Sequence, residues 1–310
     1  MCTPSLEFFM EHISKHTMKL EKQRSAVRLS VTPWLLLTPF MAIYVLFFIY
    51  PAAETLYLSL TESSLTQTKA FIGLDNYITL LQDFEFWDAI IQTFYFSLLT
   101  VIPLTALGLG LALLINRMKK GAHWVQAIFF IPNVLPISVM VLLIGWIFHA
   151  KFGAFHYLSG SDINVFSDVN WAMPTVALAT IWWTVGFNML LFLAALNNIP
   201  RDLYEAAALD GATSFGTFRY ITFRYIRTTV GIVFILQLIA SLKIFGQTFL
   251  MTKGGPFDAT KVVLHYMYET GFVYQDAGYA SAIAIVFLFI VIAILLLQAL
   301  IRRLATRGKA

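Results

Sequence analysis

The chain has 310 residues, of which 59% are hydrophobic and 12% are charged, and its formal net charge at pH 7 is +4. Soluble domains carry about 25% charged residues, so this composition excludes an ordinary soluble protein and predicts a polytopic α-helical membrane protein. The basic excess therefore bears on orientation in the membrane rather than on a nucleic-acid partner. The single cysteine, Cys2, excludes an internal disulfide and a multi-cysteine metal site.

Six apolar runs are long enough to cross a bilayer. Residues 1–30 precede them, are polar and basic, and are expected to form an amphipathic segment at the membrane surface; no signal peptide is predicted. A membrane domain over 31–303 follows, then a tail at 304–310. The spans are expected at about 33–51, 89–115, 124–149, 172–196, 228–251 and 279–301. Pro132 and Pro136 are expected to kink the third span.

Basic residues alternate from one loop to the next. Residues 1–30 hold five Lys or Arg, the loop at 116–123 three, the loop at 197–227 four and the C-terminal residues 302–310 four. The intervening loops hold only Lys69, Lys151, Lys253 and Lys261. The positive-inside rule thus predicts an all-α membrane protein with six transmembrane helices, both termini cytoplasmic, and a cytoplasmic loop between the fourth and fifth helices.

This cytoplasmic loop, 201–225, has an ordered pattern. Asp202 is placed to cap a short helix that carries Glu205, and Asp210-Gly211 supplies the turn that ends it. A second amphipathic segment follows, whose apolar residues are spaced for one face: Phe215, Phe218, Ile221 and Phe223. Such a pair of segments, with alanines on its surface, suits a docking protein. An ordinary amphipathic loop is the alternative.

The expected spans hold no pair of carboxylates, no His-x-x-x-His and no Glu-x-x-His. A proton relay or metal centre in lipid needs such groups, so no catalytic residue and no metal site are predicted. Lys243 is the one charge well inside a span. It either reaches for water or backbone carbonyls, or it meets an anionic substrate group or a neighbouring subunit.

The fourth and fifth spans also carry uncharged polar and aromatic residues. They are Trp182, Trp183, Thr184, Asn188, Gln237, Ser241 and Gln247. Aromatic rings cover the C–H faces of a sugar while amides and hydroxyls bond its hydroxyl groups, so this set suits a neutral, hydroxyl-rich solute. Helix-to-helix hydrogen bonds are the equally weighted alternative.

Two motifs carry a family resemblance. The first is Glu205-Ala206-Ala207, Asp210-Gly211-Ala212 and Ile221; the second is Thr252 to Pro256, Thr260, Tyr266, Tyr268 and Gly278 to Ala282. The first resembles the EAA loop of the permease subunits of binding-protein-dependent ABC importers, and the second resembles their sugar-uptake branch, with the maltose and glycerol-3-phosphate permeases. Tyr50-Pro51 and Phe71 to Tyr77 are similar to the first, F-type, permease of the pair.

The resemblance implies a bacterial inner-membrane subunit that imports a sugar or sugar derivative by ATP-driven alternating access. Its implied partners are a second, G-type permease, two ATPase subunits and an extracytoplasmic solute-binding protein. ATP and Mg belong on the ATPases, since this chain has no GxxxxGK[ST] loop. The residues implied in coupling to the ATPase are Glu205, Ala206, Ala207, Asp210 and Gly211.

The resemblance also implies a substrate pathway midway in the membrane. Its positions are Trp182, Trp183, Thr184, Phe187, Asn188, Gln237, Ala240, Ser241, Lys243 and Ile244. The sequence departs from the family at Phe223-Arg224, where Leu-Pro is usual, and at Gly246, where Asp is frequent. An unpaired Lys243 leaves an anionic sugar conjugate open, and a polyol is a further alternative. A secondary transporter and a non-transporting scaffold are the rivals from other classes.

Overall fold

The computed structural model describes residues 31–64, 66–160 and 164–307, so the predictions for 1–30 and for the last three residues lie outside it. The chain divides into two units at Thr55 and Leu56, and each is described by itself. The first unit runs through α2 (Val31–Tyr44) and the π-helical turn η1 (Val45–Ile49) into α3 (Tyr50–Leu58). Its side chains from Trp34 to Glu54 are exposed and mostly apolar, as expected of a helix that meets lipid or a partner.

The second unit is helical apart from one short hairpin. Its elements are β1 (Thr61–Ser63), β2 (Thr68–Phe71), α4 (Asp75–Gln82), α5 (Phe84–Asn116), α6 (Ala122–Val134), α7 (Ile137–Ile147), α8 (Ala154–Ser159), α9 (Val169–Asn197), α10 (Arg201–Leu209), α11 (Ser214–Thr217), η2 (Phe218–Thr222), α12 (Phe223–Leu242), α13 (Gly246–Met251), α14 (Val263–Tyr268), η3 (Glu269–Val273) and α15 (Ala277–Arg307). The two strands are antiparallel, with Thr61 opposite Phe71.

In the described residues, five helices are long and apolar enough to cross a membrane, and the bent pair α6–α7 supplies the sixth crossing if it counts as one. This confirms the predicted all-α membrane fold, whereas the cytoplasmic position of both termini stays a prediction. The pair bends by 103° where Leu135 takes an extended conformation before Pro136, so the predicted kink is confirmed at Pro136, whereas Pro132 lies inside α6. The segment expected at 228–251 is divided, since α12 ends at Leu242 and α13 begins at Gly246.

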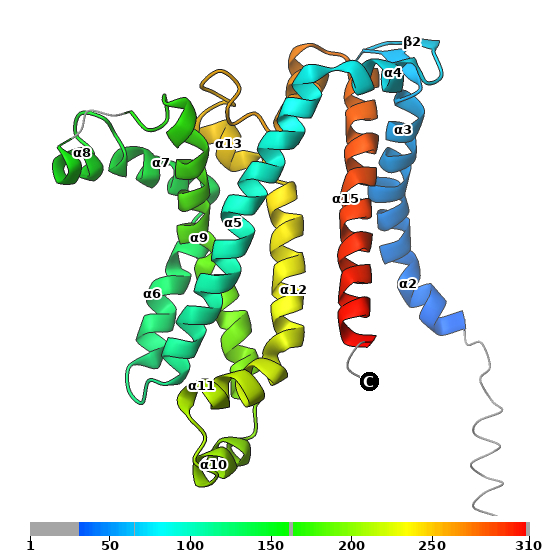
Figure 1. Cartoon of the computed structure of the whole chain (residues 1–310). Helices are drawn as coiled ribbons and strands as arrows, with labels where there is room; N and C mark the ends of the chain where they lie inside the picture. The colour runs from blue at the N-terminus through cyan, green and yellow to red at the C-terminus, as the bar shows by residue number, and fades with distance from the viewer. Residues whose placement is uncertain (1–30, 65, 161–163, 308–310) are drawn as a thin grey trace, which may run out of the picture. The chain divides into compact units, whose positions relative to one another are not determined.

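Close packing of α9 between α5 and α6 forms the centre of the second unit (Figure 1). Gly108 of α5 lies against α9, where a Cβ would come within 2.7 Å of the Asn188 Cβ. Gly186 of α9 lies against α6, where a Cβ would come within 2.0 Å of the Phe129 carbonyl oxygen. Small residues bring helix backbones together in this way, because lipid provides no hydrophobic drive for association.

The loops of the second unit fall at two ends (Figure 1). The turn between α5 and α6 lies at the same end as α10 and α11, whereas the hairpin, α4, α8 and α13 lie at the other. The basic loops at 116–123 and 197–227 therefore share one end, which agrees with the alternation expected from the charges.

The Asp83 carboxylate joins α5, α14 and α15 through hydrogen bonds, at the end of the second unit that holds the hairpin. Asp83 Oδ2 accepts hydrogen bonds from the Tyr266 hydroxyl of α14, at 2.5 Å, and from the Tyr279 hydroxyl of α15, at 2.6 Å. Its Oδ1 accepts from the Glu85 N–H at 2.9 Å and caps α5. Burial, followed by the bond to Asp83, raises the pKa of Tyr266, so this hydroxyl remains a donor at neutral pH.

Replacing Asp83 with alanine is expected to destabilise the subunit by about 3 kcal/mol, because it strands two tyrosine hydroxyls that had a charged acceptor. Thermal unfolding of the purified subunit measures the effect. Asp88→Ala, on the exposed surface of the same helix, is the matched control and should leave the melting temperature unchanged. Adding Tyr266→Phe and Tyr279→Phe to Asp83→Ala should recover part of the loss; no recovery would show that the three residues do not act as a unit.

Candidate functional site

The predicted docking helix exists as α10, but its start differs from the prediction. The N-cap position is Pro200, which makes no side-chain capping bond, and Asp202 lies in the first turn. The expectation that Asp202 caps the helix is therefore wrong. The proline favours an earlier start because its fixed φ suits the entry to a helix, and the Asp202 carboxylate then stands near the positive end of the helix dipole.

The end of α10 follows the prediction. Gly211 has φ +73°, and its N–H donates to the Ala208 carbonyl oxygen at 3.2 Å. The Ala212 N–H reaches the Ala207 carbonyl oxygen at 2.9 Å. These two bonds form a Schellman motif, whose left-handed position favours glycine. The Asp210-Gly211 turn is confirmed.

The exposed side of α10 carries most of the predicted docking residues. Glu205, Ala206 and Asp210 are exposed, whereas Ala207 is half-buried. Leu209 is 90% exposed and was not predicted as part of this surface. The sequence could have indicated this residue, because the leucine follows a run of small residues and stands directly before the Asp-Gly turn. An exposed leucine beside alanines supplies the apolar contact that a docking groove needs.

The residues after the turn continue directly into the membrane. The Thr213 hydroxyl accepts from the Gly216 N–H at 3.2 Å and caps α11, which runs through η2 into α12. Phe215 is 75% exposed, while Phe218, Ile221 and Phe223 are half-buried. The expectation of one shared apolar face is therefore wrong for Phe215, because the wider turn of η2 changes the angular spacing of the side chains.

The polar residues of the predicted pathway are divided between buried contacts of the helices and more exposed positions such as Lys243. Gln237 Nε2 donates to Asn188 Oδ1 at 2.7 Å, and the Ser241 hydroxyl bonds the Thr100 hydroxyl at 2.8 Å. These four residues are buried between α5, α9 and α12. Their bonds join neighbouring helices, which is the packing role weighed against solute binding. Asn188 Nδ2 has no hydrogen-bond partner among the described residues.

The aromatic positions separate in the same way. Trp182 and Phe187 are 40% and 42% exposed, and the Thr184 hydroxyl bonds the Thr180 carbonyl of its own helix. Trp183 donates from Nε1 to the Leu135 carbonyl oxygen at 3.1 Å and so fixes the break between α6 and α7. Of the apolar positions, Ala240 is exposed and Ile244 is buried.

Lys243 ends α12 and is exposed. Within the described ranges no carboxylate pairs with it, and its ammonium group stands at the negative end of the helix dipole. The Lys243 ammonium group is therefore accessible to an anionic group of a solute in the predicted pathway.

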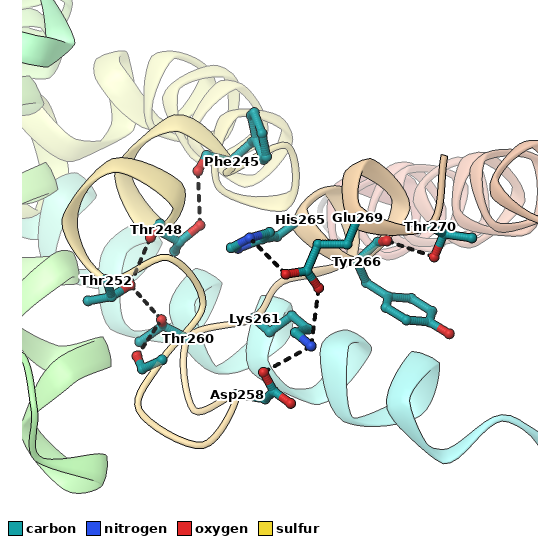
Figure 2. A network of polar contacts seen from close by, with 11 residues as sticks. Phe245, Thr248, Thr252, Asp258, Thr260, Lys261, His265, Tyr266, Glu269 and Thr270 are labelled. Atoms are coloured by element: carbon teal, nitrogen blue, oxygen red, sulfur yellow. Dashed lines mark hydrogen bonds and ion pairs between the residues drawn. The ribbon is translucent and has the colours of Figure 1, made fainter. Parts of the chain in front are cut away.

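The second sequence motif has a structural role that the sequence did not reveal. The Thr252 and Thr260 hydroxyls lie 2.6 Å apart, and the Thr260 hydroxyl donates to the Gly255 carbonyl oxygen at 2.8 Å (Figure 2). Gly278, the second residue of α15, lies against the hairpin, where a Cβ would come within 2.2 Å of the Thr61 carbonyl oxygen. The motif thus fixes the segment between α13 and α15.

Charged groups complete this segment. Figure 2 shows Lys261 between Asp258 and Glu269, with Nζ–O distances of 2.9 and 3.2 Å. Burial lowers the pKa of Lys261, but its bonds to the two carboxylates outweigh burial and raise it. Burial lowers the pKa of His265, although Glu269 lies 3.6 Å from its Nε2. His265 is therefore neutral at pH 7.

The subunit is expected to lose stability as the pH falls below about 6.5, because the unfolded chain then binds a proton that folded His265 resists. The loss for one proton is at most about 1.4 kcal/mol per pH unit. Melting temperatures between pH 5 and 8 measure it. His265→Gln should flatten the profile, whereas His123→Gln, on an exposed side chain, should not. An unchanged slope in His265→Gln would contradict the assignment.

Known proteins are similar to this chain in sequence and in fold. Residues 104–306 match the family described as binding-protein-dependent transport system inner membrane component. The sulfoquinovosyl glycerol transport system permease protein SmoG of Agrobacterium fabrum is 35% identical over 81% of this chain and 84% of its own length. The trehalose/maltose transport system permease protein MalF of Thermococcus litoralis is 34% identical over 81% of this chain and 87% of its own.

A solved structure has the same fold. It is a chain of a bacterial ABC transporter involved in the import of the acidic polysaccharide alginate, with a TM-score of 0.80, 22% identity, and coverage of 91% of this chain and 98% of that one. The helical membrane fold, the matched family and these relatives agree with one another. The chain therefore belongs to the binding-protein-dependent transport system inner membrane components, as a permease of the sugar ABC importer class.

Proposed function

We propose that this permease passes a sugar or sugar derivative into the cytoplasm by alternating access, and that α10 receives the movement of an ATPase subunit. The observation that carries the proposal is the form of α10, a short helix with Glu205, Ala206 and Leu209 exposed and a left-handed glycine at its end. Alanines permit close approach of a groove, and the basic loops at this end favour a cytoplasmic position for α10 by the positive-inside rule.

Contacts of α10 with the membrane helices support its role as a lever. The Tyr204 hydroxyl lies 3.0 Å from the Thr222 hydroxyl of η2. Leu203 and Tyr204 also pack against a buried cluster that includes Phe192 of α9 and Ile226 of α12. A push on the exposed side of α10 therefore reaches both helices through contiguous packing.

Reconstitution tests the proposal. The chain is incorporated into liposomes with a second permease and two ATPase subunits, and the solute-binding protein is added outside. We expect ATP-dependent solute uptake and ATP hydrolysis that the loaded binding protein stimulates. Uptake driven by an ion gradient without ATP would favour a secondary transporter. Assembly with the ATPases without any uptake would favour a scaffold.

The second candidate is the same function with an anionic sugar derivative as solute, and Lys243 favours it. SmoG is named for sulfoquinovosyl glycerol, which carries a sulfonate, whereas MalF is named for the neutral sugars trehalose and maltose. The exposed, unpaired ammonium of Lys243, seen within the described residues, suits a sulfonate, phosphate or carboxylate.

Replacing Lys243 with methionine is expected to lower uptake of an anionic sugar by about tenfold or more, because one charge-assisted contact of about 1.5–3 kcal/mol is lost. Uptake of a neutral analogue should not change. Competition between neutral and anionic analogues in the reconstituted importer measures the ratio, with Lys253→Met as the matched control. Unchanged selectivity in Lys243→Met would remove the anionic alternative.

A further inference from the structure

A cavity lies beside α10, and its lining contains none of the exposed docking residues Glu205, Ala206 and Leu209. It has a volume of ≈ 600 Å³, and it is lined by the ends of α5 and α9 together with α10, α11 and η2. Pockets for small molecules in proteins have volumes of about 300–1,000 Å³. The cavity is thus large enough for a small ligand or for the headgroup of a lipid.

The lining of this cavity is positively charged. Among its fourteen residues are two arginines, Arg117 and Arg201, and no acidic residue. In the part of the chain that the structure describes, neither arginine has an ion-pair partner. Asn116, Asn197 and Ser214 add neutral donors to the lining. Two guanidinium groups with amide and hydroxyl donors are the groups that bind tetrahedral oxyanions.

The two arginines come from different parts of the fold. Arg117 is the C-cap residue of α5, and Arg201 is the first residue of α10. The start of α10 has no side-chain cap, so its first N–H groups remain available as donors, while the Asp202 carboxylate in the same turn offsets part of the positive dipole end. An anion held by both arginines would connect α10 to α5.

We propose that this cavity binds a phosphate group, and that the bound phosphate restrains α10. The phosphate would belong to inorganic phosphate or a phosphate ester in the cytoplasm, or to the headgroup of an anionic lipid. Arg201, Tyr204 and Ala208 line the cavity, whereas Glu205, Ala206 and Leu209 are exposed and are not part of its lining. A phosphate in the cavity therefore leaves these three docking residues uncovered. Binding of phosphate does not depend on the proposed transport function. The effect of the bound phosphate on coupling does rest on that function.

Binding is measured on the whole importer complex in nanodiscs of phosphatidylcholine, with radiolabelled inorganic phosphate as the probe. We expect saturable binding whose affinity falls by more than about tenfold in the double variant Arg117→Gln/Arg201→Gln. Arg224→Gln, an exposed arginine outside the cavity, is the matched control and should bind as wild type does. Ala208→Phe, which fills the cavity without changing its charge, should also lose binding. Phosphate on the ATPases is common to all variants and cancels.

A second arm identifies a lipid source. The complex is moved to nanodiscs containing phosphatidylglycerol, and retained lipid is counted by native mass spectrometry. Retention that the double variant loses, without binding of free phosphate, assigns the site to a headgroup. No difference between wild type and the double variant in either arm overturns the proposal, as does equal loss in Arg224→Gln.

The effect on coupling is read from ATP hydrolysis stimulated by the binding protein. Added phosphate should inhibit the wild type more strongly than the double variant, because a restrained α10 moves less readily. Uptake by the wild type without added phosphate is measured in parallel. If the wild type shows no uptake, this counts against the transport function but does not affect the binding result. Equal inhibition of the wild type and the double variant by phosphate overturns the proposal that bound phosphate restrains α10.

Discussion

Gly186→Ala is expected to prevent assembly of the native subunit or to lower its stability by about 1–3 kcal/mol or more. A Cβ at Gly186 would lie 2.0 Å from the Phe129 carbonyl oxygen and 2.8 Å from the Phe130 Cα. These are backbone atoms of α6, so no change of side-chain rotamer can relieve the overlap, and α6 and α9 must separate. The yield of monodisperse protein and its melting temperature measure the effect.

Gly110→Ala is the matched control. Gly110 also lies within a membrane helix, but a Cβ there would meet no atom within 4 Å. Alanine should be neutral or stabilising at Gly110, by up to about 1 kcal/mol, because it favours the helix over glycine. Similar melting temperatures for the two variants would show that α6 and α9 do not cross as closely as the structure indicates.

Gly211→Asp is expected to uncouple ATP hydrolysis from import while leaving the subunit in the membrane. The substitution puts a side chain at φ +73° and a second carboxylate beside Asp210, at the negative end of the α10 dipole. Allosteric coupling energies of about 1–3 kcal/mol correspond to losses of about 5- to 150-fold in import. Uptake and ATP hydrolysis, measured in the same liposomes, check the result.

The control for Gly211→Asp is Gly121→Asp. Gly121 has φ +77° and open space around it, and it lies in the turn at the same end of the second unit as α10. It precedes α6, where an aspartate suits the start of the helix. Normal import in Gly211→Asp, or equal loss in both variants, would contradict a specific coupling role for the end of α10.

Local chemistry explains why the spans and α10 could be predicted. Hydropathy marks the spans, Pro136 marks the bend after α6, and the Asp210-Gly211 pair marks the end of α10; each signal depends on residues within a few positions of one another. Phe215 was wrongly assigned to the apolar face because the π-helical turn that follows it has no sequence signal of its own. Asp202 was misassigned because the helix begins two residues earlier than predicted, directly after Pro200.

The features that could not be predicted depend on contacts between residues that are distant in the sequence. Asp83 meets tyrosines 183 and 196 positions away, and Gln237 meets Asn188 across 49 positions. Polar residues on two spans are compatible both with a solute and with each other, and only their spatial pairing separates the two roles. The charge of the cavity beside α10 likewise depends on bringing Arg117 and Arg201, which are far apart in the sequence, into the lining of one cavity.

The hydrogen bonds of Asp83 can be completed only after the last span of the subunit has been synthesised. The buried cluster around it joins Leu80 of α4 and Phe86 of α5 to Ile283 and Phe287 of α15, the last span. The ribosome therefore releases the early half of this cluster long before its partners exist. Until α15 enters the membrane, Leu80 has no cover from that helix and Asp83 lacks the Tyr279 hydroxyl. A nascent chain stopped before α15 should consequently be recognised and degraded by membrane proteases, whereas the full chain should persist.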